Sequence, residues 1–158
     1  MSQLTSFFFN LSPEFDPPLQ ERTNIAEWVE KLIEAATGFI AIGSEGEIIG
    51  CAFAYCNDHE TKLAYVSILA VSPKSQKSGL GSVLFETLLR SCWEAGMSAL
   101  NGRFDGKKQW QIDFYQHRFG ARQLEQAITD TYPGAVFLQI DLEQRYGTIS
   151  AGNPTNEG

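Results

Sequence analysis

The stretch VSPKSQKSGLGSVLFETLLRSCWEAG, residues 71–96, decides the fold of this chain. The run TKLAYVSILAV just before the loop, residues 61–71, becomes strongly apolar towards its end and predicts a central strand. From Gly79 the apolar residues recur at helical spacing, which predicts a helix that ends near Ala95, with Gly96 as its terminator. The helical face predicted to be buried comprises Leu80, Val83, Leu84, Thr87, Leu88, Ser91, Cys92 and Ala95. Two glycines therefore stand between a buried strand and the start of a long helix.

Glycines at a helix start have two explanations. A helix N-terminus carries unsatisfied N–H groups and the positive end of the helix dipole, so it can bind an anion. Here Gly79 and Gly81 expose the backbone, Lys77 adds positive charge, and Ser82 offers a hydroxyl group. The alternative is a plain strand-to-helix turn that needs small residues. The glycines alone leave the two readings equally open.

Two familiar phosphate-binding loops do not fit this stretch. The dinucleotide-binding fingerprint needs a third glycine about three residues after Gly81, where Leu84 stands. The P-loop needs Gly-Lys-Ser/Thr after its glycine-rich segment, whereas Lys77 and Ser78 come before the glycines here. Both classes are excluded.

A third pattern matches. Val71-Ser72-Pro73 followed by Gln76-Lys77-Ser78-Gly79-Leu80-Gly81 resembles the Val-x-Pro and Gln/Arg-x-x-Gly-x-Gly/Ala signature of the GNAT (GCN5-related) N-acetyltransferase superfamily. The resemblance spans roughly residues 4–142 and implies an α+β fold, with a mixed, mostly antiparallel central sheet flanked by helices.

The resemblance also implies which residues bind an acyl-CoA, usually acetyl-CoA. The pyrophosphate would meet the loop formed by Gln76, Lys77, Ser78, Gly79, Leu80, Gly81 and Ser82. The pantetheine arm would pair with the strand edge at Leu69, Ala70 and Val71, which places the thioester at a gap in the sheet. A backbone N–H of the same strand would stabilise the oxyanion.

Tyr115 is the candidate catalytic residue. It stands in Phe114-Tyr115-Gln116-His117-Arg118-Phe119-Gly120, which is similar to the family's Phe/Leu-Tyr-x-x-x-Gly-Phe motif, and the resemblance implies that it protonates the departing thiolate. The alternative is a tyrosine that only packs beside the cofactor.

Three positions depart from the family pattern: Ser67 replaces a glutamate, Lys108 replaces an asparagine, and Phe119-Gly120 reverses the usual order. With Ser67 in place of the glutamate, Asp58 and Glu60 are the nearest alternative bases, although a solvated turn explains them better.

The rest of the chain predicts one domain over residues 1–143 and a disordered tail over residues 144–158. The further elements predicted are a strand at residues 4–10, a helix from Thr23 or Asn24 to about Ala36, a hairpin within residues 39–58, a strand at 97–104, a short helix at 109–118 and a strand at 136–142.

Composition narrows the function classes. The 158 residues carry a net charge of −7, which argues against a nucleic-acid partner and tilts the choice of ligand towards cations. No apolar run approaches the roughly 18 to 20 residues that cross a bilayer, and no signal peptide is evident, so a cytoplasmic setting without membrane contact is expected.

Cys51, Cys56 and Cys92 lack metal-ligand spacing and are interpreted as buried apolar residues. His59 and His117 have no ligand partners at suitable spacing, so no metal is expected.

These observations lead to one function and one alternative. The first is an acetyl-CoA-dependent N-acetyltransferase that acts on the primary amine of a small molecule by direct attack in a ternary complex. The alternative is a GNAT-fold module, weak or inactive in catalysis, that binds acyl-CoA or a protein partner. The acceptor's identity stays open, because its pocket is expected from loops around residues 10–37 and 120–135. The resemblance leaves a homodimer open as well.

Overall fold

A six-stranded sheet forms the centre of the protein. The computed structural model describes residues 2–125 and 133–147, and in these the strand order is β1-β2-β3-β4-β6-β5. Neighbouring strands run antiparallel except β3 and β4, which are parallel. The strands are β1 (Thr37–Ile42), β2 (Ile48–Tyr55), β3 (Leu63–Val71), β4 (Ala99–Asp105), β5 (Arg122–Gln123) and β6 (Ala135–Asp141). The predicted class, a mixed and mostly antiparallel α+β fold, is confirmed.

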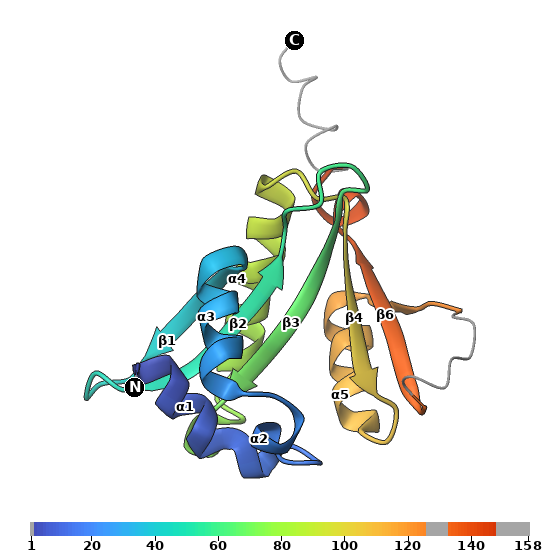
Figure 1. Cartoon of the computed structure of the whole chain (residues 1–158). Coiled ribbons are helices and arrows are strands. Elements are labelled where there is room, and N and C mark those ends of the chain that lie inside the picture. Colours follow the sequence, from blue (N-terminus) through green and yellow to red (C-terminus); the bar gives the residue numbers. More distant parts are fainter. Residues whose placement is uncertain (1, 126–132, 148–158) are drawn as a thin grey trace.

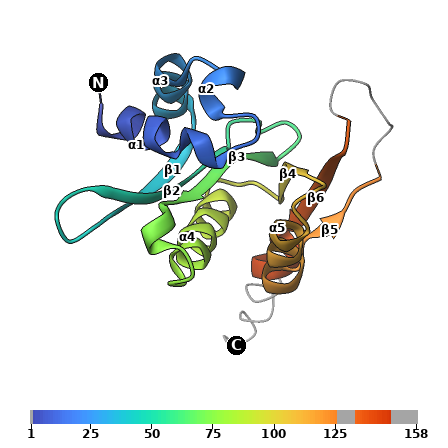
Figure 2. The same cartoon turned by 90° about the horizontal axis from the view of Figure 1, so that it is seen from below.

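Helices cover the two faces of this sheet unequally. They are α1 (Gln3–Leu11), α2 (Leu19–Arg22), α3 (Ile25–Ala35), α4 (Leu80–Glu94) and α5 (Gln109–Asp113). Helices α1, α2 and α3 lie on one face of β1–β3, whereas α4 lies on the other face (Figures 1 and 2). Helix α5 lies on the α4 side, against β4 and β6 (Figure 2). Each face has its own apolar core, and α4 and α5 share the larger one.

Most predicted elements are present. The expected hairpin forms β1 and β2, and Gly46, with φ of 84°, makes its turn. Strand β3 is central, between β2 and β4. Asn24 caps α3 by accepting a hydrogen bond from the N–H of Glu27 at 3.1 Å. The short strand β5 was not predicted, because two residues carry no periodic signal.

The predicted strand over residues 4–10 is wrong, because this segment forms helix α1. Ser2 caps the helix by accepting a hydrogen bond from the N–H of Thr5 at 3.1 Å. Leu4, Phe7, Phe8 and Leu11 are buried, and their spacing of three and four residues is helical. The run of three phenylalanines resembles a strand, but Phe8 rather than Phe9 faces the core. Burial on the helical period outweighs the strand propensity of the aromatic residues.

The buried face of α4 is also rotated from the prediction. Its buried residues are Leu84, Phe85, Leu88, Leu89 and Cys92, whereas Val83 is 62% exposed. The rotation arises because α4 packs against the sheet and also against the segment after α5, where Phe85 meets the rings of Tyr115 and Phe119.

All three cysteines are buried and free, as interpreted from sequence. Cys56, which directly follows β2, packs against Cys92 of α4, and their sulfur atoms lie 3.2 Å apart. Burial raises the pKa of the Cys51 thiol to about 12, so this thiol stays protonated at neutral pH.

The predicted tail begins too early. Glu143–Gly147 forms a π-helical turn in which Tyr146 is buried. The Arg145 guanidinium lies 2.9 Å from the Glu86 carboxylate on α4, which ties this turn to the larger core. Residues 144–147 are therefore part of the fold, and the rest of the predicted tail, 148–158, lies outside the described residues.

The helical assignment of α1 predicts unequal effects of two neighbouring substitutions. Phe8 is fully buried, with its ring 4.8 Å from that of Trp28, whereas Phe9 is 37% exposed. Phe8→Ala should lower the free energy of unfolding by about 3–5 kcal/mol, and Phe9→Ala by less than about 1 kcal/mol. Urea unfolding of both variants measures the difference. A larger loss for Phe9→Ala would instead support the strand.

Candidate functional site

The loop between β3 and α4 has an unusual backbone. Lys77 and Gly79 both take positive φ, at 65° and 88°, on either side of Ser78. Gly79 is the N-cap of α4 in the left-handed conformation. A Cβ atom at Gly79 would meet nothing within 4 Å, so the glycine is needed for its conformation rather than for space.

This conformation presents a row of N–H groups at the start of α4. The first helical hydrogen bond runs from Val83 N–H to Gly79 carbonyl oxygen at 3.2 Å. The Leu80 N–H has only a long contact to Ser78 Oγ, at 3.4 Å. Five N–H groups of the loop and the first helical turn have no acceptor among the described residues; they belong to Lys77, Ser78, Gly79, Gly81 and Ser82. Such a row, at the positive end of a 15-residue helix, attracts an anion.

The side chains of the loop fix its shape. Gln76 donates from Nε2 to the Val71 carbonyl oxygen at 3.1 Å, and Ser78 donates from Oγ to the Ser75 carbonyl oxygen. These two side chains are therefore engaged with the loop itself, and Ser78 offers its backbone N–H to a ligand. The Lys77 side chain is exposed beside the same amides.

The end of β3 has one free edge. Ser72 N–H donates to the Ile49 carbonyl oxygen on β2, so the backbone groups of Val71 and Leu69 point to the opposite edge. That edge faces β4. The backbone groups of Ala70, by the same alternation, point towards β2.

Strands β3 and β4 separate along their length. They pair only from Leu63–Tyr65 to Ala99–Asn101, and β3 continues to Val71 while β4 continues to Asp105 (Figure 1). The pairing of β2 with β3 shifts between Phe53 and Ala54, which leaves Ser67 without a partner in a bulge. The bulge lies two residues beyond the last β3–β4 pair, at the point where the two strands begin to separate.

A cleft of about 580 Å³ occupies this separation. Its walls come from α2 and the segments around it, β3, the end of β4, and α5 with the turn after it. The lining residues are Phe15, Leu19, Arg22, Thr23, Trp28, Tyr55, Tyr65–Leu69, Arg103–Asp105, Lys108, Gln111 and Tyr115. A second hollow of about 660 Å³, between α1 and the β1–β2 turn, shares no residue with it.

Tyr115 closes the cleft on the α5 side. It belongs to the π-helical turn Phe114–Arg118, and its ring packs against Phe85 at 5.0 Å and Phe104 at 4.6 Å. The side chain is 3% exposed, and burial raises the pKa of its phenol above the ordinary value. No hydrogen bond joins its hydroxyl to another described residue. A protonated phenol therefore borders the cleft with its donor unused.

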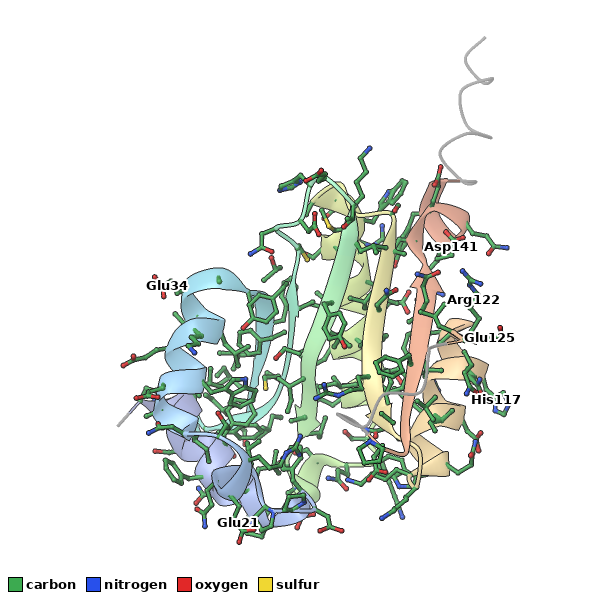
Figure 3. All side chains as sticks on the ribbon, turned by 45° about the vertical axis from the view of Figure 1, so that its right-hand side comes forward. Glu21, Glu34, His117, Arg122, Glu125 and Asp141 are labelled. Carbon is green, nitrogen blue, oxygen red and sulfur yellow. The ribbon has the colours of Figure 1, made fainter. Side chains whose placement is uncertain are left out.

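The other titratable candidates lie elsewhere. Asp58 Oδ1 accepts the N–H groups of Thr61 and Glu60, which lowers its pKa, and neither Asp58 nor Glu60 lines the cleft. His117 is exposed and points away from the sheet (Figure 3). Asp105 is the carboxylate that lines the cleft among the described residues, and sequence reasoning missed it. The strand predicted at 97–104 ended one residue short of it.

A family model described as "Acetyltransferase (GNAT) family" matches residues 3–121 of the chain. The chain belongs to the GNAT family. None of the curated proteins compared with the chain matches it.

Solved GNAT structures share the fold. A putative GNAT acetyltransferase from Desulfovibrio desulfuricans is 16% identical, with a TM-score of 0.71 over 89% of this chain and 92% of that one. A GNAT acetyltransferase from Staphylococcus aureus MU50 is 13% identical, with a TM-score of 0.70 over 89% and 91%. A GNAT acetyltransferase from Elizabethkingia anophelis with acetyl-CoA bound is 21% identical, with a TM-score of 0.60 over 73% and 82%.

The positions that depart from the GNAT pattern lie either in the core or in the cleft. Phe119 is buried with its ring 4.8 Å from that of Phe85, and Gly120, with φ of 69°, ends the π-helical turn. The reversed order thus keeps an aromatic residue in the core and a glycine at the helix end. Ser67 and Lys108 both line the cleft.

Two negative findings apply to the described part of the chain. No helix in it is long and apolar enough to span a bilayer. No group of three or more His, Cys, Asp or Glu side chains in it is arranged to hold a metal ion.

The two loop glycines predict opposite effects on stability. Gly79→Ala forces a side chain into the left-handed region and should lower the free energy of unfolding by about 1–2 kcal/mol. At Gly81, a helical position, a new Cβ would lie 3.7 Å from Val71 Cγ2, which is ordinary contact. Gly81→Ala should therefore raise stability by up to about 1 kcal/mol. Urea unfolding measures both, and an equal loss in the two variants would contradict this account of the loop.

Proposed function

We propose that the protein is an acetyl-CoA-dependent N-acetyltransferase that moves an acetyl group to the primary amine of a small molecule. The carrying observation is that one strand, β3, lines the cleft closed by Tyr115 with its residues up to Leu69, and then leads through the loop after Val71 to the five free N–H groups at the start of α4. Membership of the GNAT family supports acyl transfer. The relative from Elizabethkingia anophelis, solved with acetyl-CoA bound, supports acetyl-CoA as the acyl donor.

The donor would bind along two surfaces. The five free N–H groups and the Lys77 ammonium would hold the diphosphate by charge-assisted hydrogen bonds. The backbone groups of Leu69 and Val71 that face β4 would pair with the amides of the pantetheine arm, as an added strand pairs with a sheet edge. The thioester then reaches the cleft between the two strands.

Transfer would proceed by direct attack in a ternary complex. The amine nitrogen forms a bond to the thioester carbonyl carbon, and a backbone N–H at the end of β3 stabilises the oxyanion. The C–S bond then breaks, and the Tyr115 hydroxyl donates its proton to the thiolate of CoA. The raised pKa keeps this phenol protonated at neutral pH, as a proton donor requires. An amine that arrives deprotonated releases one further proton after the attack. This proton passes to solvent, and solvent reprotonates the Tyr115 phenolate, so a serine at position 67 is compatible with this chemistry.

Replacement of Tyr115 by phenylalanine tests the assignment. Tyr115→Phe keeps the ring and its packing but removes the proton donor, so kcat should fall by about a hundredfold or more. The release of CoA thiol with an active amine measures the rate. Tyr146→Phe is the matched control, because it removes a buried hydroxyl outside the cleft, and its kcat should stay within about twofold of the parent.

Binding of acetyl-CoA is measured separately, from the melting temperature. Saturation at about a hundred times Kd adds roughly 2.7 kcal/mol, and Tyr115→Phe should keep the resulting shift of about 5–10 °C. Unchanged turnover in Tyr115→Phe would remove its role as the acid. A shift without transfer to any amine would instead support a binding module, and no shift would overturn the choice of acetyl-CoA.

A further inference from the structure

The charge of the cleft is opposite to that of the chain. The whole sequence carries −7, whereas the charged residues that line the cleft in the described part of the chain are three cations, Arg22, Arg103 and Lys108, and one carboxylate, Asp105. The overall charge favoured a cationic ligand, whereas the charge of the cleft lining favours an anionic group. A polyamine or another dication would enter a cleft whose local field repels it.

The two arginines lie on the same face of the sheet. Phe104 packs against Tyr115 on the α5 side, so its neighbour Arg103 points to the opposite face, where α1, α2 and α3 lie. Arg22 ends α2 on that face, with its guanidinium 6.0 Å from the centre of the Phe15 ring. Both arginines are thus separated by the sheet from α4, which carries the N–H row proposed for the acyl donor.

Arg22 and Lys108 can contribute positive charge to the binding of an anion in the cleft. Neither Arg22 nor Lys108 forms an ion pair with a carboxylate in the described residues. Asp105, the carboxylate that lines the cleft among the described residues, accepts the N–H of Lys107 at Oδ1, 2.9 Å away within its own turn, and its single negative charge leaves the described lining with an excess of positive charge. A guanidinium presents parallel N–H donors that match the two oxygens of a carboxylate. Apolar walls stand beside them, formed by Phe15, Leu19 and Trp28.

We propose that the acceptor is an amino acid: a primary amine that also carries a carboxylate, with the carboxylate bound by Arg22 and Arg103 on the face opposite α4. An apolar side chain of the acceptor would lie against Phe15 and Trp28, and Lys108 would add positive charge near the end of β4. This proposal rests on the proposed function and names its substrate class.

The test compares acceptors that differ in one group only. Phenylalanine, phenylalaninamide and phenethylamine share an amine and a ring, but only the first carries a carboxylate; leucine, leucinamide and isopentylamine repeat the comparison with an aliphatic side chain. For at least one series, kcat/KM for the carboxylate form should exceed that of the amide by about tenfold or more. The aminophosphonate analogue separates a carboxylate site from a phosphate site. Faster transfer to the amides, to spermidine or to the phosphonate would overturn the proposal.

Substitutions then locate the anion site. Arg22→Gln and Arg103→Gln should each reduce the preference for the carboxylate form over the amide by about tenfold, mainly through KM for the amino acid, with KM for acetyl-CoA unchanged. Lys31→Gln is the matched control, because Lys31 is exposed on the neighbouring α3 and does not line the cleft. An unchanged preference in both arginine variants would overturn the assignment of the carboxylate to them.

A binding measurement separates this inference from the proposed function. Calorimetry of the same acceptors against the parent protein, with CoA present, detects the anion site without any transfer. Binding of the amino acid but not of its amide, without acetylation, would support the anion site and overturn the proposed function. Acetylation of neutral or cationic amines alone would support the proposed function and overturn the amino-acid acceptor.

Discussion

Only three residue pairs hold β3 to β4, and the candidate site depends on their separation beyond that point. Two strands that stayed paired would satisfy each other's backbone groups and leave no room between them. A bulge at Ser67 interrupts the regular pairing of β3 with β2, and the edge of β3 at Leu69 and Val71 faces β4 without pairing to it. An open edge is an aggregation hazard in most proteins, but here it lies inside a cleft walled by helices and side chains.

The separated strands need a second element to hold them apart. An aromatic cluster provides it: Phe85 of α4 meets Tyr115 and Phe119, and Tyr115 in turn meets Phe104 of β4. Each such ring pair contributes on the order of 0.5–1.5 kcal/mol beyond its buried area. The cluster joins α4 to the turn after α5, so the helix that carries the N–H row and the residue that closes the cleft form one packed unit. This packing also explains why Phe119-Gly120 works in reversed order, since the ring is buried and the glycine ends the turn.

The charge of the cleft also differs from the net charge of the chain. A net charge of −7 repels anions at long range, yet a cleft whose described lining carries three cations and one carboxylate attracts them at short range. The cations come from α2, β4 and the residue before α5, which are distant in sequence. These three residues meet only in the folded chain, so the net charge of the sequence could not indicate the local charge of the cleft.

The strand-loop-helix unit at residues 61–96 could be predicted from the sequence, because glycines at a helix start, a proline after the strand and a change of apolar period are all local signals. The sequence also determined the hairpin of β1 and β2 and the position of Tyr115 in a helical turn. The tertiary structure decided that residues 4–10 are helical, since only packing shows that Phe8 and not Phe9 is buried. It decided which face of α4 is covered, because that depends on a contact with residues about 30 positions away. It also decided the charge and walls of the cleft, because these are sums over elements that meet only when β3 and β4 diverge.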